Sequence, residues 1–375
     1  MREDASENHP IWHLRFTISQ WLPLLREELS KGSFTLSPVK LVKTTDGSLL
    51  ECWEPQDSLV LKYTALLLEP RLREHIPTLS KDCYHLSGSG GVKAAVAKVK
   101  NLTRGGHYPY IARSDAKGYY ANIRHTPLLG LLRSCNVDPN LIDIVSQYCQ
   151  RLRVRDGYYA ETSKGISLGC SLSPLMGALY LSPLDLAMRK ISGIRYVRYM
   201  DDWVILATSR WKLRHAVRVM NQVLQSLGLE QHPDKTFIGR VQRGFDFLGV
   251  QFTAQGETSP SAVAMARHTE KTARLYEQGA SPERIGQYRQ NWLRYLRGIL
   301  GRDHPATSTQ AGNLPHPTTM QATVLSSPNH SHFHRCPLEG VPTKIRNKKN
   351  EKDNTEQTRN LPRRDRWDRM RCFRG

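Results

Sequence analysis

Apolar positions follow helical and strand periods from about residue 10 to residue 300, so this stretch is predicted to be folded throughout. In several segments apolar residues recur three and four positions apart, which is the spacing of one face of a helix. Gly228 ends one of these segments in the manner of a helix C-cap. The predicted helices are 56–73, 125–133, 139–151, 171–190 and 211–227, followed by a helix pair over 266–300.

Three short runs of β-branched and aromatic residues predict strands instead. They cover 110–115, 194–199 and 203–207. Because only residues 200–202 separate the second run from the third, these two are predicted to pair as a hairpin. The turn of this hairpin carries two adjacent acids, Asp201 and Asp202.

The apolar pattern is lost after residue 301. Residues 302–375 are rich in Pro, Thr, Ser, Asn and His, and they carry 14 Lys or Arg against 7 Asp or Glu. A segment of this composition cannot bury enough apolar surface to offset the entropy of ordering. We therefore expect a basic, disordered tail.

The net charge of +20, from 54 Lys plus Arg against 34 Asp plus Glu, predicts a polyanionic partner. Each phosphate that a basic side chain neutralises releases condensed counterions, which favours association. Nucleic acid is the first candidate partner, and an anionic membrane surface is the second.

The composition speaks against membrane insertion and against a disulfide scaffold. The chain has no run of about 18 apolar residues that could span a membrane, and residues 1–4 do not lead into a stretch of signal-peptide type. A cytoplasmic protein is expected. The seven cysteines are scattered and form no C-x-x-C pair, so they are predicted to be reduced thiols.

The adjacent acids Asp201 and Asp202 stand between apolar strands, where two like charges are costly. An exposed hairpin turn would explain an isolated Asp-Asp pair. Divalent cations make the pair favourable if a third carboxylate is near, and Asp115 at the end of 110–115 is the candidate. Three carboxylates on adjacent strands can hold two Mg²⁺ ions about 3.5–4 Å apart and support phosphoryl transfer.

Further segments follow one another in a fixed order around these acids. They are 38–47 (PVKLVKTTDG), 114–125 (SDAKGYYANIRH), 165–174 (GISLGCSLSP), 199–202 (YMDD), 227–236 (LGLEQHPDKT) and 244–249 (GFDFLG). Together they resemble the motifs of the reverse transcriptase family, particularly the bacterial enzymes related to group II intron and retron polymerases. The resemblance covers about residues 35–300 and implies an α+β right-hand polymerase with fingers, a palm of antiparallel sheet plus helices, and a helical thumb.

The resemblance also implies roles at the nucleotide. Asp115, Asp201 and Asp202 would be metal ligands, and Tyr120 would be the aromatic gate that clashes with a ribonucleotide 2′-hydroxyl. Gly169 would let the backbone approach the incoming nucleotide or the template base. Leu168, just before it, stands where many members have Gln, which puts one nucleotide contact in doubt.

Lys235 would donate a proton to the departing pyrophosphate or pair with it, by the same resemblance. In the hairpin that grips the primer end, Phe247, Leu248 and Gly249 would contact the primer or template. Arg294 would do so from the thumb, on the basic face of the helix pair.

The fingers hairpin at 38–47 has Asp46-Gly47 as its turn, and Lys43 is the candidate to contact the triphosphate. The arginine expected just after this turn is missing, because Ser48, Leu49 and Leu50 stand there. Arg71 or Arg73 is the alternative cation.

Four parts of the chain are thus predicted. They are an N-terminal helical extension (1–34), fingers and palm (35–254), a helical thumb (255–301) and the basic tail (302–375).

The function implied is that of an RNA-directed DNA polymerase, a nucleotidyltransferase that extends a DNA or RNA primer with dNTPs on an RNA template. Two Mg²⁺ ions, or Mn²⁺, would be its cofactors. A dedicated non-coding or intron RNA is a further candidate partner, and a mobile element or an anti-phage defence system is the candidate setting. Two alternatives stay open: an RNA-binding maturase or splicing helper, and a polymerase that makes untemplated or protein-primed DNA.

Overall fold

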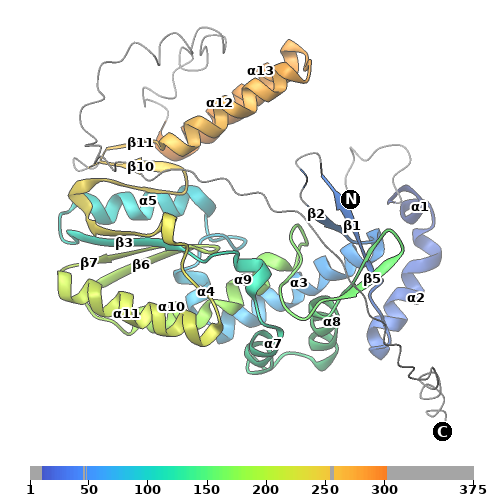
Figure 1. The fold of residues 1–375 in the computed structure, drawn as a ribbon. Coiled ribbons are helices and arrows are strands. Elements are labelled where there is room, and N and C mark those ends of the chain that lie inside the picture. Colours follow the sequence, from blue (N-terminus) through green and yellow to red (C-terminus); the bar gives the residue numbers. More distant parts are fainter. Residues whose placement is uncertain (1–10, 45–46, 48, 254–256, 302–375) are drawn as a thin grey trace, which may run out of the picture. The chain divides into compact units, whose positions relative to one another are not determined.

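A four-stranded antiparallel sheet in the order β6-β7-β3-β8 forms the centre of the chain (Figure 1). The computed structural model describes residues 11–44, 47, 49–253 and 257–301. The predicted hairpin is confirmed, because β6 and β7 pair directly. On its other edge β7 pairs with β3, the third predicted strand. The strands are β3 (Tyr110–Asp115), β6 (Ile194–Tyr199), β7 (Asp202–Ala207) and β8 (Phe237–Arg240).

Helices cover both faces of this sheet, as Figure 1 shows. The alternation of strand side chains separates the two cores: Val204 and Leu206 pack toward α5, whereas Trp203 and Ile205 pack in the larger core with α9, α10 and α11. Trp203 is fully buried, and its Nε1 donates to Sδ of Met220 on α11 at 3.0 Å. The helices are α5 (Gly91–Arg104), α9 (Ser173–Tyr180), α10 (Ser182–Arg189) and α11 (Arg210–Leu227).

A second sheet has the strand order β2-β1-β4-β5. Its strands come from before and after β3 in the sequence. Glu51 on β2 and Arg151 form a buried ion pair at 2.7 Å that ties this sheet to the end of α8. The strands are β1 (Val39–Lys43), β2 (Leu49–Cys52), β4 (Leu152–Arg155) and β5 (Tyr158–Glu161). The remaining helices before the third sheet are α1 (Ile11–Phe16), α2 (Ile18–Lys31), α3 (Pro55–His75), α4 (Thr78–Lys81), α6 (Tyr119–Asn122), α7 (His125–Arg133) and α8 (Pro139–Cys149).

A small third sheet leads into two long helices, the predicted helix pair. Leu296 and Leu300 of α13 pack in one cluster with Val96 of α5, which anchors the pair to the central sheet. The elements are β9 (Phe245–Phe247), β10 (Val250–Phe252), β11 (Thr258–Pro260), α12 (Ala262–Glu277) and α13 (Pro282–Leu300), and the short 3₁₀ turns η1 (Pro233–Lys235) and η2 (Val241–Arg243) precede them.

One predicted helix is wrong in its extent. The single helix over 171–190 is two helices, α9 and α10, because Pro183 lacks the N–H that would continue the first one. The helix predicted over 56–73 is confirmed as α3, which runs through Pro70 to His75. The carbonyl that Pro70 leaves without a partner belongs to Leu66, which is 54% exposed, so water can satisfy it.

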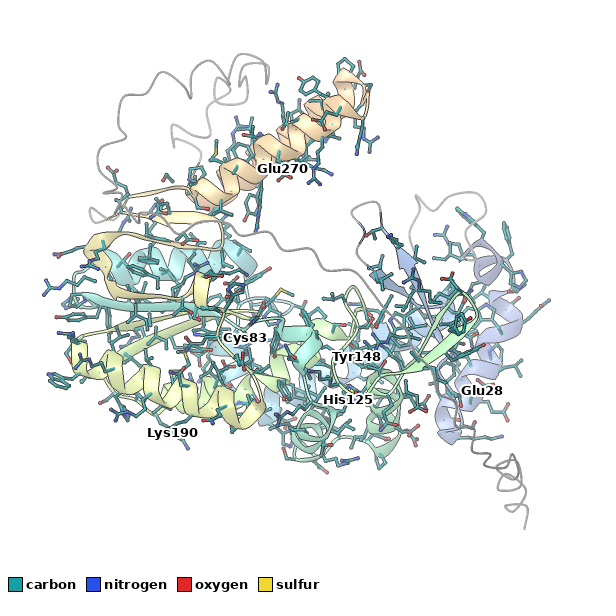
Figure 2. All side chains as sticks on the ribbon, in the orientation of Figure 1. Glu28, Cys83, His125, Tyr148, Lys190 and Glu270 are labelled. Carbon is teal, nitrogen blue, oxygen red and sulfur yellow. The ribbon has the colours of Figure 1, made fainter. Side chains whose placement is uncertain are left out.

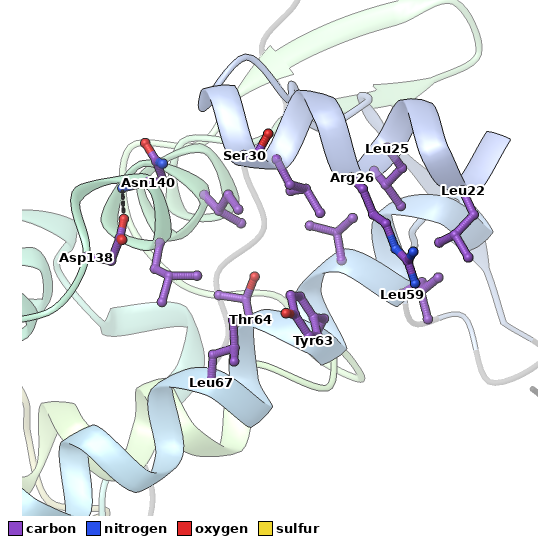
Figure 3. A pocket seen from close by; sticks show the side chains of 14 residues that line it. Leu22, Leu25, Arg26, Ser30, Leu59, Tyr63, Thr64, Leu67, Asp138 and Asn140 are labelled. Carbon is purple, nitrogen blue, oxygen red and sulfur yellow. Dashed lines mark hydrogen bonds between the residues drawn. The ribbon is translucent and has the colours of Figure 1, made fainter.

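A cavity of about 640 Å³ lies between α2, α3 and α8 (Figure 3). Leucines from all three helices line it, and the hydroxyl of Thr64 at its wall is buried without a hydrogen-bond partner. None of the predicted site residues lines this cavity. None of the helices in the described ranges is long and apolar enough to cross a membrane.

Candidate active site

The strand register brings the three predicted carboxylates together. Asp115, the last residue of β3, is the direct cross-strand partner of Asp202, the first residue of β7. Asp201 stands in the turn between β6 and β7, and its carbonyl accepts a hydrogen bond from the Ala116 amide at 3.3 Å. Residues directly opposite in an antiparallel pair have Cβ atoms about 4.5–5.5 Å apart. Acids far apart in the sequence therefore share one end of the sheet.

The surroundings of the turn carboxylates disfavour their charged forms. Burial, and then the negative charge of Asp201, raise the pKa of Asp202 to about 6. Burial, and then the charge of Asp115, also raise the pKa of Asp201 above its usual value. Like charges in a poorly solvated site cause such shifts, and a bound cation would reverse them.

Lys235 meets the third carboxylate. Its Nζ lies 2.6 Å from Oδ2 of Asp115. The 3₁₀ turn η1 places this lysine, and the turn is joined to β3 because the His232 amide donates to the Asp115 carbonyl at 3.0 Å. The second carboxylate oxygen, Oδ1 of Asp115, is buried without a hydrogen-bond partner.

The donor set fits a hard divalent cation. Carboxylate oxygens are the ligands that Mg²⁺ and Mn²⁺ prefer, and the unpaired Oδ1 of Asp115 is a buried acceptor that such an ion would satisfy. Within the described ranges, no group of three or more His, Cys, Asp or Glu side chains stands ready to hold a metal ion. The Lys235 ammonium takes one oxygen of Asp115 in this arrangement.

Arg113 belongs to the site and was missed by the sequence analysis. It lies two residues before Asp115 on the same face of β3, donates to the Lys235 carbonyl at 3.2 Å, and forms an ion pair with Asp246 at 3.3 Å. Its charge lowers the pKa of Asp202 against the larger effect of burial. The alternation of side chains along β3 could have placed Arg113 on the same face as Asp115. Its partners, Lys235 and Asp246, lie in distant segments, so no local pattern could identify them.

Tyr120 stands beside the carboxylates on α6. Burial, and then the charge of Asp201, raise the pKa of its hydroxyl to about 12. Its backbone carbonyl accepts from the Ile166 amide at 2.8 Å, so Tyr120 is tied to the loop that carries Gly169. Gly177 of α9 leaves room for the ring, since a Cβ there would lie 3.2 Å from Cε1 of Tyr120. The structure thus brings Tyr120, the carboxylates and this loop together.

Gly169 has a φ of +81°, a conformation that favours glycine. A Cβ at this position would lie 3.9 Å from Cδ1 of Leu50 on β2, so the loop reaches the second sheet. Leu168 is 57% exposed and Leu50 is 42% exposed. Leu168 stands where many family members have Gln, and Leu50 stands where the fingers arginine is expected. Both positions therefore present an exposed leucine in place of a polar side chain.

Lys43 lies exposed at the end of β1 in that same sheet. Asp46 and Ser48 of the predicted turn lie outside the described residues. Arg73, one of the alternative cations, is bound by Glu69 at 2.8 Å and by the Ser87 carbonyl at 2.5 Å. These bonds hold Arg73 at the end of α3.

A cleft of about 670 Å³ opens beside the carboxylates between the central sheet and the helix pair. The hairpin of β9 and β10 contributes Leu248 and Gly249, which both have positive φ values in its turn. Phe247 is fully buried in the core cluster, so its side chain does not face the cleft. The lining also includes Asp202, Lys235, Asp246, Arg267, His268, Tyr288, Trp292 and Tyr295.

The helix pair presents aromatic and basic side chains to this cleft. His268 of α12 stacks on Trp292 of α13 with ring centroids 3.8 Å apart. Arg267 lines the cleft, whereas Arg294, the thumb arginine singled out in the sequence, is exposed on α13 and is not part of the lining. The lining positions of α13 are Tyr288, Trp292 and Tyr295, one stripe at helical spacing.

An antiparallel sheet with carboxylates at one end, helices behind it and a helical wall across a cleft defines a polymerase palm. A family model described as "Reverse transcriptase (RNA-dependent DNA polymerase)" matches residues 57–252. The chain belongs to the reverse transcriptase family. The predicted reverse transcriptase family is confirmed.

One solved structure shows the same fold, and a second is similar. Telomerase from Candida albicans, in complex with a TWJ fragment of telomeric RNA, aligns with a TM-score of 0.51 and 14% identity over 83% of this chain and 60% of that one. Apo telomerase from Candida tropicalis, truncated from its C-terminal domain, aligns at 0.47 and 14% over 65% of this chain and 60% of that one. The predicted α+β right-hand polymerase fold is confirmed.

The chain spans about 60% of the length of each of these two telomerase chains. A sequence search of curated proteins found no match.

Proposed function

We propose that the chain copies RNA into DNA, extending a primer with dNTPs by metal-assisted phosphoryl transfer. The observation that carries this proposal is the register that sets Asp115 opposite Asp202, beside Asp201 in the turn. Like charges directly opposite one another destabilise a strand pair. Repulsion between the carboxylates of Asp115 and Asp202 therefore destabilises the sheet, and a bound cation would offset this repulsion.

Asp115, Asp201 and Asp202 would hold two divalent cations, Mg²⁺ or Mn²⁺. When bound, these ions would activate the primer's 3′-hydroxyl and neutralise the departing pyrophosphate. The unpaired Oδ1 of Asp115 and the raised pKa of Asp202 support this assignment.

Lys235 would pair with the pyrophosphate or donate a proton to it. Its side chain is 50% exposed and borders the cleft, so it can turn from Asp115 toward a ligand there. General acid catalysis requires a group within hydrogen-bond reach of the leaving oxygen.

The nucleotide would lie between Tyr120, the Gly169 loop and the second sheet. Tyr120 would exclude a 2′-hydroxyl by its bulk. Gly169 would allow close approach of the backbone, and Lys43 would contact the triphosphate. The Ile166 amide donates to the Tyr120 carbonyl, so Tyr120 and the loop that carries Gly169 are held together. This bond supports their contacting the same nucleotide.

The primer and the RNA template would follow the cleft. Leu248 and Gly249 of the hairpin would contact the primer end, with Phe247 behind them in the core. Arg267, and Arg294 farther along the helix pair, would contact phosphates. The net charge of +20 agrees with such a partner.

We assign residues 35–254 to fingers and palm, 255–301 to a thumb, and 1–34 to an N-terminal helical extension. Helices α1 and α2 fall in the extension, and α12 and α13 in the thumb. The basic segment 302–375 lies outside the described residues. A mobile element, or a defence system with its own non-coding RNA, is the setting we propose, and sequencing the RNA and cDNA that copurify with the chain would identify it.

Primer extension tests the function. The purified protein with Mg²⁺, poly(rA)/oligo(dT) and dTTP should incorporate dTTP, and the Asp201→Asn, Asp202→Asn double variant should not. Asp143→Asn is the matched control, because this acid is exposed on α8 and should leave the rate unchanged. Equal incorporation by the double variant would contradict the catalytic assignment.

A further inference from the structure

The turn that carries Asp201 is held in a backbone conformation that its sequence does not favour. Met200 has a φ of +55°, one of only a few non-glycine residues with positive φ in the described part of the chain. A side chain in this left-handed region costs conformational energy, and such a residue persists where its surroundings enforce it. Contacts outside the hairpin must therefore hold Met200.

Both backbone polar groups of Met200 are bound by side chains, one from His85 outside the hairpin and one from Arg198 on β6. The Met200 amide donates to Nδ1 of His85 at 2.9 Å. The Met200 carbonyl accepts from Nη1 of Arg198 at 3.0 Å. Two side chains thus bind the two peptide groups on either side of the Met200 Cα, next to the carboxylates.

His85 is itself anchored to the helix behind the sheet. Its Nδ1 accepts from Met200, so the ring proton lies on Nε2, where it is donated to the Pro174 carbonyl of α9 at 3.1 Å. Burial, and then the charge of Arg198, lower the pKa of His85 to about 4, which keeps the ring neutral. Sγ of the buried Cys83, which is labelled in Figure 2, lies 3.2 Å from the same Nδ1.

Backbone bonds fix the segment that carries this histidine. The Tyr84 amide donates to the Arg198 carbonyl at 2.9 Å, and the Arg198 amide donates to the Asp82 carbonyl at 3.0 Å. His85 therefore follows a short stretch that is paired with β6 at Arg198. Strand β6 thus positions His85, and His85 in turn binds Met200 in the turn that follows β6.

Arg198 is anchored in the same way to the helices behind the sheet. Its guanidinium and the carboxylate of Asp185 on α10 are both fully buried, with Nε to Oδ1 at 2.7 Å and Nη2 to Oδ2 at 2.5 Å. A third bond runs from Nη2 to the Ala178 carbonyl of α9 at 3.3 Å. Asp185 and the Ala178 carbonyl hold Nε and Nη2 of Arg198. The planar guanidinium can therefore direct Nη1 toward the Met200 carbonyl in one orientation only.

We propose that His85 and Arg198 are positioning residues that clamp Met200 and thereby hold Asp201 and Asp202 in the arrangement that accepts divalent cations. The proposal rests on the metal role proposed above for these two carboxylates. The clamp couples the catalytic turn to α9 through His85 and to α10 through Arg198. Supporting bonds of this kind typically change metal affinity or activity by about 10–100-fold.

Two isosteric substitutions of His85 separate clamping from packing. In His85→Asn, the amide oxygen can take the place of Nδ1 and accept from Met200, while the bond to Pro174 is lost. In His85→Gln, the amide nitrogen can take the place of Nε2 and donate to Pro174, while the Met200 amide loses its acceptor. Each variant loses one hydrogen bond to the backbone, and His85→Gln also loses the 3.2 Å contact between Nδ1 and Sγ of Cys83. Cys83→Ala, which removes only this sulfur contact, is the control for that loss, so a purely structural role predicts equal effects of the two backbone bonds.

The readouts are Mn²⁺ affinity, measured by electron paramagnetic resonance without nucleotide or nucleic acid, and the Mg²⁺ concentration for half-maximal dTTP incorporation. We expect His85→Gln to weaken Mn²⁺ binding by about tenfold or more and to raise the Mg²⁺ requirement. His85→Asn, which keeps an acceptor for the Met200 amide, should be affected clearly less than His85→Gln on both measures. Thermal unfolding of the two variants, expected to be similar, provides the control for folding.

Equal weakening in both variants, unchanged affinity in His85→Gln, or no Mn²⁺ binding by the wild type would overturn the clamp. A wild type that binds Mn²⁺ with the expected order of variants, but incorporates no dTTP, would instead contradict the proposed polymerase function and leave the clamp standing. The two failures are therefore distinguishable.

Discussion

The ammonium of Lys235 lies 2.6 Å from Oδ2 of Asp115, at the carboxylate that two strands of the central sheet bring opposite Asp202. This ion pair and a divalent cation would compete for the same oxygen. The lysine is half exposed, whereas Asp115 is nearly buried, so the lysine is the partner that can leave.

Removing the ammonium should therefore have two opposite effects. In Lys235→Met we expect the Mg²⁺ concentration for half-maximal activity to fall, because Asp115 is freed, and kcat to fall by about tenfold or more, because the leaving pyrophosphate loses its cationic partner. A Mg²⁺ titration of primer extension measures both. Lys235→Arg, which can keep the pair with Asp115, should retain the wild-type Mg²⁺ requirement. An unchanged requirement in Lys235→Met would refute the competition.

Tyr120 should set the choice between deoxynucleotides and ribonucleotides. Shortening it in Tyr120→Val opens space for a 2′-hydroxyl, and we expect the ratio of rNTP to dNTP incorporation efficiency to rise by about tenfold or more. Single-nucleotide extension assays give this ratio. The adjacent Tyr119 is the matched control, since its hydroxyl donates to the Gly177 carbonyl within the core. Tyr119→Phe should destabilise the protein without altering selectivity, and a selectivity change there would argue against the gate.

The two arginines of the helix pair should differ in their effect on nucleic-acid affinity. Arg267 lines the cleft and Arg294 does not. Losing one phosphate contact reduces the slope of log affinity against log salt by about one. We expect this reduction in Arg267→Gln and a smaller one in Arg294→Gln, measured with a primer–template duplex by fluorescence anisotropy. A larger reduction in Arg294→Gln than in Arg267→Gln would indicate that the nucleic acid does not bind in the cleft.

Asp57 should make the stability of the fold depend on pH. Burial raises its pKa from 3.8 to about 6, although its carboxylate accepts from the Ser37 amide at 3.1 Å. The folded state therefore holds this proton more tightly than the unfolded state, and the stabilisation is lost as pH rises from 3.8 to about 6.

The substitution Asp57→Asn keeps an acceptor for Ser37 and removes the titration. Urea unfolding should show the variant more stable than wild type by about 3 kcal/mol well above pH 6. Below pH 3.8, where the wild-type carboxyl is protonated in both states, the two proteins should be nearly equal. A constant difference across this range would assign the effect to something other than this carboxyl.

The sequence determined the local elements and the identity of the acids. Residues 110–115 and 194–199 are strands with the predicted boundaries, and α11 ends at Gly228 as expected. Periodicity and caps are properties of neighbouring residues, so one sequence suffices for them. Asp115, Asp201 and Asp202 stand out because charges within apolar strands are unusual, and the order of the motifs predicted the family that the comparisons confirm.

Only the tertiary structure decided which residues surround those acids. The ion pair of Lys235 with Asp115, the contacts of Arg113 and the bond of His85 to Met200 join segments far apart in the chain. No local pattern marks His85, because its role depends on a strand that comes much later in the sequence. Register, burial and distance arise when the elements pack, and these quantities turn three scattered aspartates into one site.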